Sequence, residues 1–83
     1  MSSKISTSGR ITILLGKYQA RTGERMSPRR LAEKAEVSKD FVYRLDSGAA
    51  RHVDLDSLAR LCDLLQCSLQ DILVLEPPHD ESV

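Results

Sequence analysis

The chain of 83 residues contains no tryptophan, few other aromatic residues and only two cysteines. Its aromatic residues are Tyr18, Phe41 and Tyr43, so a core has to consist mainly of Leu, Ile, Val and Ala. Such a core favours helices. Cys62 and Cys67 are too few for the disulfide framework of a small secreted protein. This scarcity fits a reducing compartment.

Long apolar runs are also missing. The longest, Ile72–Leu75, is far below the roughly 18 residues that a membrane span requires, and the first residues lack the apolar segment of a secretory signal. We therefore expect a cytoplasmic protein without membrane contact. A chain this short has room for one small domain, and no credible nucleophile–base or paired-carboxylate arrangement is present. We expect no enzymatic activity, no cofactor and no small-molecule ligand.

The cysteines and histidines do not indicate a metal site. Cys62 and Cys67 lack the paired spacing of closed zinc sites, and His79 lies in a predicted tail, away from His52. Because the two cysteines are five residues apart across a predicted helix end, we expect their thiols to point in different directions. Their predicted role is that of small buried apolar side chains.

Charge is balanced over the whole chain but separated along it. Residues 1–51 carry eleven Lys and Arg against five Asp and Glu, whereas residues 52–83 carry one basic residue against seven acidic ones. A basic half can attract a polyanion such as nucleic acid even in a neutral protein, because the attraction depends on local potential. Solvated helix faces would give the same pattern.

Two flexible tails, over residues 1–9 and 76–83, are predicted to flank one helical domain over residues 10–75. The first tail is small and polar, and the second contains two consecutive prolines, which cannot continue a helix. Between the tails, apolar residues recur at helical spacing. This pattern predicts five short helices in a compact all-α domain.

Each predicted helix carries recognisable start or end signals. The β-branched start of the first helix, residues 11–13, leaves a short strand as an alternative there. The signals include N-cap residues, an N-terminal proline, glycines that end helices and a capping box. In chain order they are Gly23 at the end of the first helix, Ser27 and Pro28 before the second, Ser38 and Gly48 around the third, Asp54 or Asp56 before the fourth, and Ser68 with Asp71 at the fifth.

The segment of residues 28–48 has the length and turn of a helix-turn-helix unit. Its two short helices are joined by Glu36 and Val37, and Ala32 is small where the helices have to approach closely. Phe41 is expected to pack beneath the first of these helices. The outer face of the second helix carries hydrogen-bonding groups that point either to solvent or to a DNA major groove, which is wide enough for one helix: Lys39, Asp40, Tyr43, Arg44 and Ser47.

A characteristic set of residues begins within this unit and continues beyond its C-terminal end: Leu31-Ala32, Val37-Ser38, Val42, Arg44-Leu45-Asp46, Gly48, Leu58, Leu61-Cys62, Leu65-Gln66-Cys67 and Asp71-Ile72-Leu73. With this set the chain resembles the lambda-repressor-like family of Cro/CI-type (XRE) helix-turn-helix regulators over roughly residues 10–75. The resemblance implies a five-helix DNA-binding domain with Ser38–Leu45 as recognition helix. It further implies a sequence-specific transcription regulator of bacterial or phage origin, with repression as the first expectation.

The resemblance also assigns roles to single residues on double-stranded DNA. Two residues depart from the family pattern: Pro28 stands where relatives often place a phosphate-contacting Gln, and Glu36 fills a turn position usually held by Gly. A positive φ at Glu36 would cost about 1 kcal/mol. The implied base readers are Lys39, Asp40 and Tyr43, and the implied phosphate contacts are Arg29, Arg44, Ser47 and Arg51.

A homodimer is expected, because family members commonly bind two half-sites about 34 Å apart. The predicted surface is the apolar end formed by Leu73, Val74 and Leu75, which exceeds what one short helix can bury against its own core. The acidic C-terminal third keeps a second interpretation open. In that interpretation the chain is a protein-interaction module, such as an antitoxin or anti-repressor partner, that does not read DNA.

Overall fold

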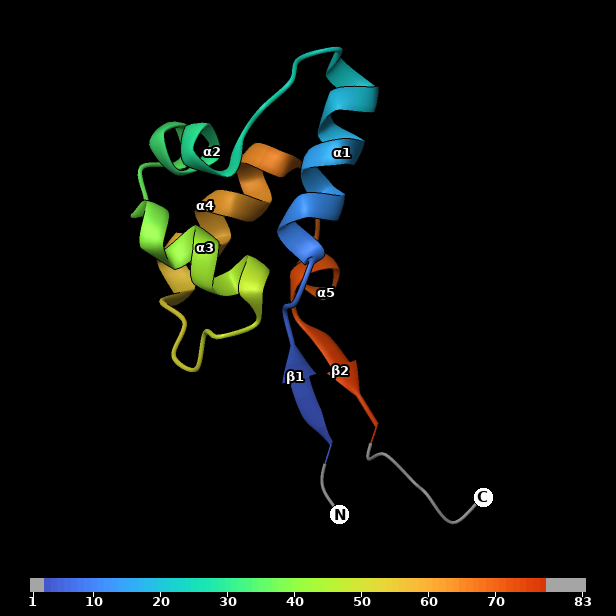
Figure 1. Ribbon diagram of the computed structural model, residues 1–83, viewed down its shortest axis with the longest axis vertical. Coiled ribbons are helices and arrows are strands. Elements are labelled where there is room, and N and C mark those ends of the chain that lie inside the picture. The colour runs from blue at the N-terminus through green and yellow to red at the C-terminus, as the bar shows by residue number, and fades with distance from the viewer. Residues whose placement is uncertain (1–2, 78–83) are drawn as a thin grey trace.

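The computed structural model describes residues 3–77, and within them the chain forms five helices and a two-stranded sheet (Figure 1). The predicted all-α fold class with five helices is confirmed, and the small sheet is an addition to it. No helix within residues 3–77 combines the length and the apolar character needed to cross a membrane. In chain order the elements are β1 (Lys4–Ser6), α1 (Arg10–Thr22), α2 (Pro28–Ala35), α3 (Lys39–Ser47), α4 (Leu55–Leu65), α5 (Leu69–Ile72) and β2 (Val74–Glu76).

Helix α1 begins before the β-branched residues at its start, so the alternative of a short strand there is wrong. Ile11 is completely buried and Thr12 receives a carboxylate contact from α3. These tertiary contacts outweigh the weak strand preference of the local sequence. At the other end Gly23 adopts a left-handed φ of 76° and its N–H donates to the Gln19 carbonyl, which ends the helix as predicted.

The next two helices start at the predicted serine caps. The Ser27 side chain accepts a hydrogen bond from Arg30 N, and the Ser38 side chain accepts one from Phe41 N, each at 3.1 Å. The turn between the helices passes through Glu36, whose φ of 59° is left-handed. The predicted backbone strain at this residue is therefore present, on the order of 1 kcal/mol.

The starts of the last two helices show which aspartate caps α4 and confirm the predicted capping box of α5. Asp54, and not Asp56, caps α4, because its carboxylate accepts from Ser57 N at 2.9 Å. At the start of α5, Asp71 Oδ2 accepts from Ser68 N at 2.9 Å, as the predicted capping box requires.

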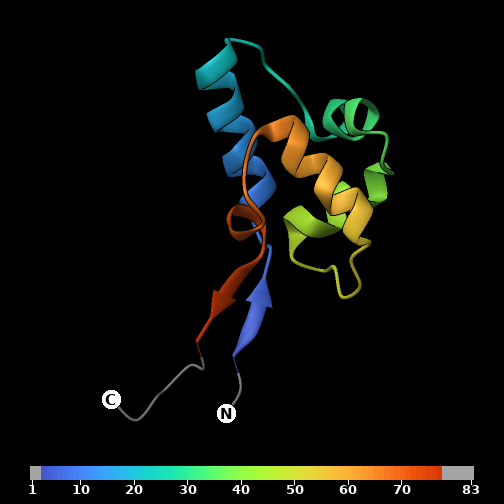
Figure 2. The same ribbon diagram turned by 180° about the vertical axis from the view of Figure 1, so that it is seen from behind.

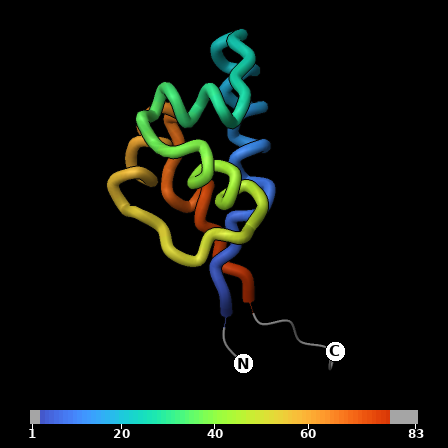
Figure 3. Tube along the Cα trace, turned by 60° about the vertical axis from the view of Figure 1, so that its left-hand side comes forward, coloured from blue at the N-terminus to red at the C-terminus, as the bar shows by residue number. Residues whose placement is uncertain are grey.

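The helices enclose one apolar core. Figure 3 shows α2 and α3 in front, and Figure 2 shows α4 on the opposite side of the domain beside α1. Phe41 is half-buried and packs against this core. The completely buried core residues come from every helix and are Ile11, Leu31, Val42, Leu45, Leu58, Leu61 and Ile72.

The sheet corrects the sequence prediction at the N-terminus. β1 and β2 pair antiparallel, with Ile5 opposite Leu75, and they extend away from the helices (Figure 1). Thr7 is buried, and its hydroxyl donates to the Leu45 carbonyl at 2.6 Å. Residues 4–9 are thus built into the fold instead of forming a flexible tail, because β1 finds a strand partner about 70 residues away that no local pattern reveals. In the predicted C-terminal tail, Glu76 belongs to β2, and residues 78–83 lie outside the described residues.

Candidate nucleic-acid interface

Helix α3 has one buried face and one exposed face. Val42 and Leu45 are completely buried on the inner face. Because helical residues three and four apart share a side, the polar residues between them point outward. The side chains predicted to meet DNA from this helix are all exposed: Lys39, Asp40, Tyr43, Arg44 and Ser47.

The segment before α1 holds the C-terminal end of α3 in place. Gly9 N donates to the Asp46 carbonyl at 2.8 Å, next to the bond from Thr7 to Leu45. Gly48 adopts a φ of 83°, and a Cβ at this residue would lie 3.1 Å from Ser8 Cβ. Only glycine fits this left-handed, crowded position without strain. The orientation of α3 therefore depends on contacts with residues 7–9 as well as on the apolar core.

An ion pair on the outer face joins two of the predicted DNA contacts. The Asp40 carboxylate lies 2.9 Å from Arg44 Nε, one helical turn further along α3. Both side chains are exposed, so the pair adds only a few tenths of a kcal/mol to the stability of the helix. Its main effect is to hold the guanidinium and the carboxylate together on one side of α3.

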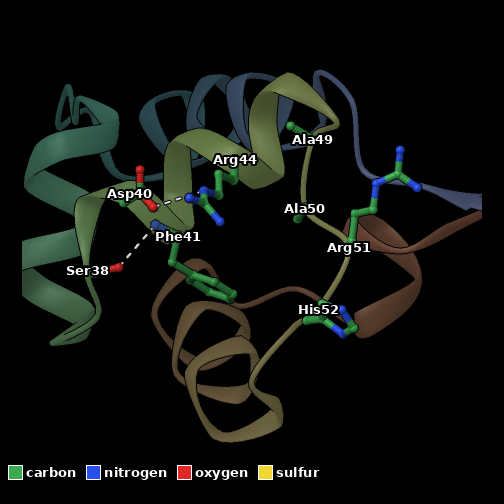
Figure 4. Close-up of a pocket in the computed structure, with 8 residues that line it drawn as sticks. All are labelled: Ser38, Asp40, Phe41, Arg44, Ala49, Ala50, Arg51 and His52. Atoms are coloured by element: carbon green, nitrogen blue, oxygen red, sulfur yellow. Dashed lines mark hydrogen bonds and ion pairs between the residues drawn. The ribbon is translucent and has the colours of Figure 1, made fainter.

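A shallow pocket of about 220 Å³ lies between α3 and the loop that follows it (Figure 4). Asp40, Arg44 and Arg51 all line it, so the structure brings these three predicted residues together. In Figure 4, however, the Arg51 side chain extends away from Arg44. Sequence reasoning missed His52, which also lines the pocket. Nothing in its local sequence distinguishes it, because the course of the loop places it there.

The other predicted residues lie outside that pocket. Lys39 and Tyr43 stand on the exposed surface of α3, where about half of Tyr43 is accessible. The Ser47 hydroxyl donates to the Arg44 carbonyl at 3.2 Å and accepts from Ala49 N at 3.3 Å. It therefore takes part in the turn that ends α3. Arg29 is exposed in the first turn of α2, next to Pro28.

A larger groove of about 860 Å³ separates the loop after α3 from the strands. Lys4 of β1 and Arg51 of the loop both line it, together with Ser47 at the end of α3. Lys4 was not predicted as a site residue, since it lies in the segment that the sequence indicated as a tail. The fold adds this cation to the edge of the α3 surface.

The basic residues around α3 differ in whether they form an ion pair with an acidic side chain. Among the described residues, Arg44 is paired with Asp40, whereas Arg29, Lys39 and Arg51 form no ion pair with another described residue. All three are exposed. Their charges are available to a polyanion without first breaking a salt bridge.

Comparison with known protein families identifies the domain that carries this surface. The family of Cro/C1-type helix-turn-helix DNA-binding domains matches residues 23–78, a stretch that includes α2, the turn at Glu36 and α3. Searches of curated proteins and of solved structures found no match. The matched stretch covers more than half of the chain. The chain belongs to the family of Cro/C1-type helix-turn-helix DNA-binding proteins.

Proposed function

We propose that the protein is a sequence-specific transcription repressor that inserts α3 into the DNA major groove. The observation that carries this proposal is the exposed polar face of α3. On the opposite face of the helix, Val42 and Leu45 are completely buried and fix the orientation of α3. A single α-helix fits the major groove, where every base pair presents a distinct set of donors and acceptors. Repression follows if the bound domain excludes transcription proteins from the same DNA.

Lys39, Asp40 and Tyr43 are the proposed base readers. Lys39 is the first residue of α3 and Asp40 is the second, which suits helix-turn-helix docking because base contacts come from the N-terminal residues of the recognition helix. A lysine donates to guanine O6 or N7, and a carboxylate accepts from cytosine N4. The acidic group also repels phosphates, so Asp40 would reject unsuitable sequences more than it adds affinity.

Arg29, Arg44, Ser47 and Arg51 are the proposed phosphate contacts. They come from α2, α3 and the following loop, and all four are exposed. Contacts of this kind fix the register of a protein on the duplex and provide most of its salt-dependent affinity. Arg44 would have to exchange part of its bond to Asp40 for a phosphate oxygen.

The proposed repressor is a homodimer formed through the end of the chain that contains Leu73, Val74 and Leu75. Leu73 and Val74 are half-buried, whereas Leu75 is 65% exposed and lies opposite Ile5, which is 56% exposed. Residues paired in register point to the same face of a sheet, so Ile5 and Leu75 form one apolar patch. A two-stranded sheet is marginal in water without further packing, and a second copy with the same patch would provide it.

Selection of bound sites from random double-stranded DNA tests this proposal. A repressor dimer should enrich a palindrome, and its binding should weaken steeply as salt concentration increases. If the chain is instead a protein-interaction module such as an antitoxin or anti-repressor partner, no sequence should be enriched. That outcome would contradict the proposal.

Single substitutions then separate base reading from phosphate binding. Lys39→Ala or Tyr43→Ala should reduce discrimination between the selected site and other DNA by about 1–3 kcal/mol. Arg51→Ala should weaken binding to all DNA and lower the salt slope by about one. Lys17→Ala is the matched control, since Lys17 is an exposed cation on α1. It should leave discrimination unchanged.

A further inference from the structure

The turn after α4 brings the two cysteines together. Cys67 N donates to the Cys62 carbonyl at 3.0 Å, and Gln66 N donates to the Asp63 carbonyl at 3.4 Å. With Gln66 at a left-handed φ of 53°, these bonds form the Schellman motif, in which the residues that flank the turn contact each other. The sequence-based expectation that the two thiols point in different directions did not include the geometry of this motif.

The backbone bond sets an upper limit on the separation of the two residues. Standard bond lengths and one hydrogen bond of 3.0 Å between Cys67 N and the Cys62 carbonyl keep the two Cα atoms within about 7 Å. Disulfides form in proteins at Cα separations up to about that value. The backbone is therefore close enough for a bond between the two sulfurs.

The side chains support this closeness. Both residues are free thiols, half-buried against the apolar core. As expected for neighbouring side chains, the Cys67 thiol lowers the pKa of Cys62 and the Cys62 thiol raises the pKa of Cys67. Burial raises the pKa of Cys62, and burial together with the Cys62 thiol raises the pKa of Cys67 to about 12. Both groups are thus protonated thiols at neutral pH, and mild oxidants should react with them slowly.

We propose that Cys62 and Cys67 are a site of oxidative modification, at which a peroxide converts the two thiols into a reversible intramolecular disulfide. The first thiol reduces one molecule of hydrogen peroxide and becomes a sulfenic acid, with release of one water. The second thiol attacks that sulfur, forms the S–S bond and releases a second water. The two sulfurs lose two electrons in total, and the peroxide gains them.

The surroundings assign an order to the two steps. Burial raises the pKa of both thiols, but the hydrogen bond with Cys67 lowers the pKa of Cys62, whereas the Cys62 thiol raises the pKa of Cys67 further. The Cys62 thiol therefore loses its proton more readily at neutral pH, so Cys62 reacts with the peroxide first. Cys67, on the other side of the turn, then closes the disulfide.

The disulfide would lock the turn that ends α4, at the point where this turn contacts α1. The closed loop contains Leu65, which is 2% exposed and whose carbonyl accepts from Arg21 Nη2 at 2.9 Å. Figure 2 shows this end of α4 beside α1. A crosslink that restricts the unfolded chain without straining the turn stabilises the folded domain. The oxidised protein should therefore unfold at a higher temperature than the reduced protein.

Intact-mass spectrometry of the full chain, before and after treatment with hydrogen peroxide under native conditions, tests the proposal. The protein should lose the mass of two hydrogens, remain a single chain on a non-reducing denaturing gel and return to its original mass with dithiothreitol. Trypsin provides the location, because no Lys or Arg follows Arg60. A single C-terminal peptide therefore contains both cysteines and should carry the whole mass loss.

Other products would overturn the proposal. These are a protein that gains only oxygen or one in which two chains become covalently linked. Cys62→Ser and Cys67→Ser are the matched variants, and each should abolish the loss of two hydrogens. Cys62→Ala replaces the first if the serine variant fails to fold. The reversible rise in melting temperature should disappear in the same variants, and no part of this test depends on DNA binding.

Discussion

The Asp46 carboxylate of α3 caps the first turn of α1 through Thr12. Its oxygens accept from Thr12 N at 3.0 Å and from Thr12 Oγ1 at 2.7 Å. Gly9 occupies the N-cap position of α1 and has no side chain to perform this role. A residue from the helix proposed to read DNA thus satisfies an amide that α1 would otherwise leave free.

Asp46→Ala should lower the free energy of unfolding by about 1 kcal/mol, the usual cost of losing an N-cap. Urea denaturation of the variant and the wild type measures this loss. A double-mutant cycle with Thr12→Ala isolates the contact, because the two losses should not add. Strictly additive losses would show that Asp46 stabilises the protein by another route.

Glu36→Gly should stabilise the domain by about 1 kcal/mol, because glycine adopts the φ of 59° without a Cβ clash. Thermal and urea unfolding both report the change. Ala59→Gly, on the exposed side of α4, is the control of opposite sign and should cost about 1 kcal/mol. Destabilisation by Glu36→Gly would mean that the Glu36 side chain contributes more than its backbone strain costs.

Asp40→Asn should weaken DNA discrimination and strengthen binding to unrelated DNA. The substitution removes a negative charge from the surface proposed to face phosphates and releases Arg44 from its ion pair at 2.9 Å. Loss of one base contact should reduce discrimination by roughly 1 kcal/mol. Binding to the selected site and to random DNA at several salt concentrations measures both effects. Equal loss of affinity for both DNAs would show that Asp40 only orients Arg44.

Stability should decrease in acid as the capping carboxylates take up protons. The hydrogen bond from the Ser57 side chain lowers the pKa of Asp54, and the backbone hydrogen bond from Ser68 lowers the pKa of Asp71, each from an ordinary value of 3.8. Because both folded-state pKa values lie below the unfolded ones, their contribution is complete above the unfolded value. It is lost as pH falls through the folded values.

Asp54→Asn and Asp71→Asn test the origin of this acid sensitivity, since the asparagine amide oxygen can still accept the hydrogen bond from Ser57 N or Ser68 N but does not titrate in this range. The double variant should lose less stability than the wild type when pH is lowered below about 4. Urea unfolding at a series of pH values gives the two curves. Parallel curves would assign the acid sensitivity to other groups.

Leu75→Glu should convert the proposed dimer into a folded monomer, because the substitution places a charge in the apolar patch formed with Ile5. Sedimentation equilibrium gives the mass, and circular dichroism reports the fold. Leu55→Glu is the matched control, since Leu55 is 74% exposed at the start of α4. It should leave the mass unchanged. A folded wild-type monomer, or a Leu75→Glu variant that remains dimeric, would contradict this interface.

The caps and turns that delimit the helices could be predicted from the sequence because they act over a few residues. Ser27, Ser38 and Asp54 accept hydrogen bonds from amides three residues ahead, and Gly48 ends α3 where a left-handed residue is required. The exposed face of α3 followed from the same local periodicity. For the candidate site, the predicted residues on α3 were thus identifiable as exposed before the fold was known.

The sequence alone determined the helical fold class, the helix-turn-helix unit and the surface of α3, since periodicity and capping are properties of neighbouring residues. Only the tertiary structure decided that β1 pairs with β2, that Asp46 caps α1 and that Arg51 and His52 share a pocket with Arg44. These relationships join segments that are distant along the chain or depend on the course of a loop. Local residue patterns cannot encode them, because such contacts exist only once the common apolar core has fixed the helices in space.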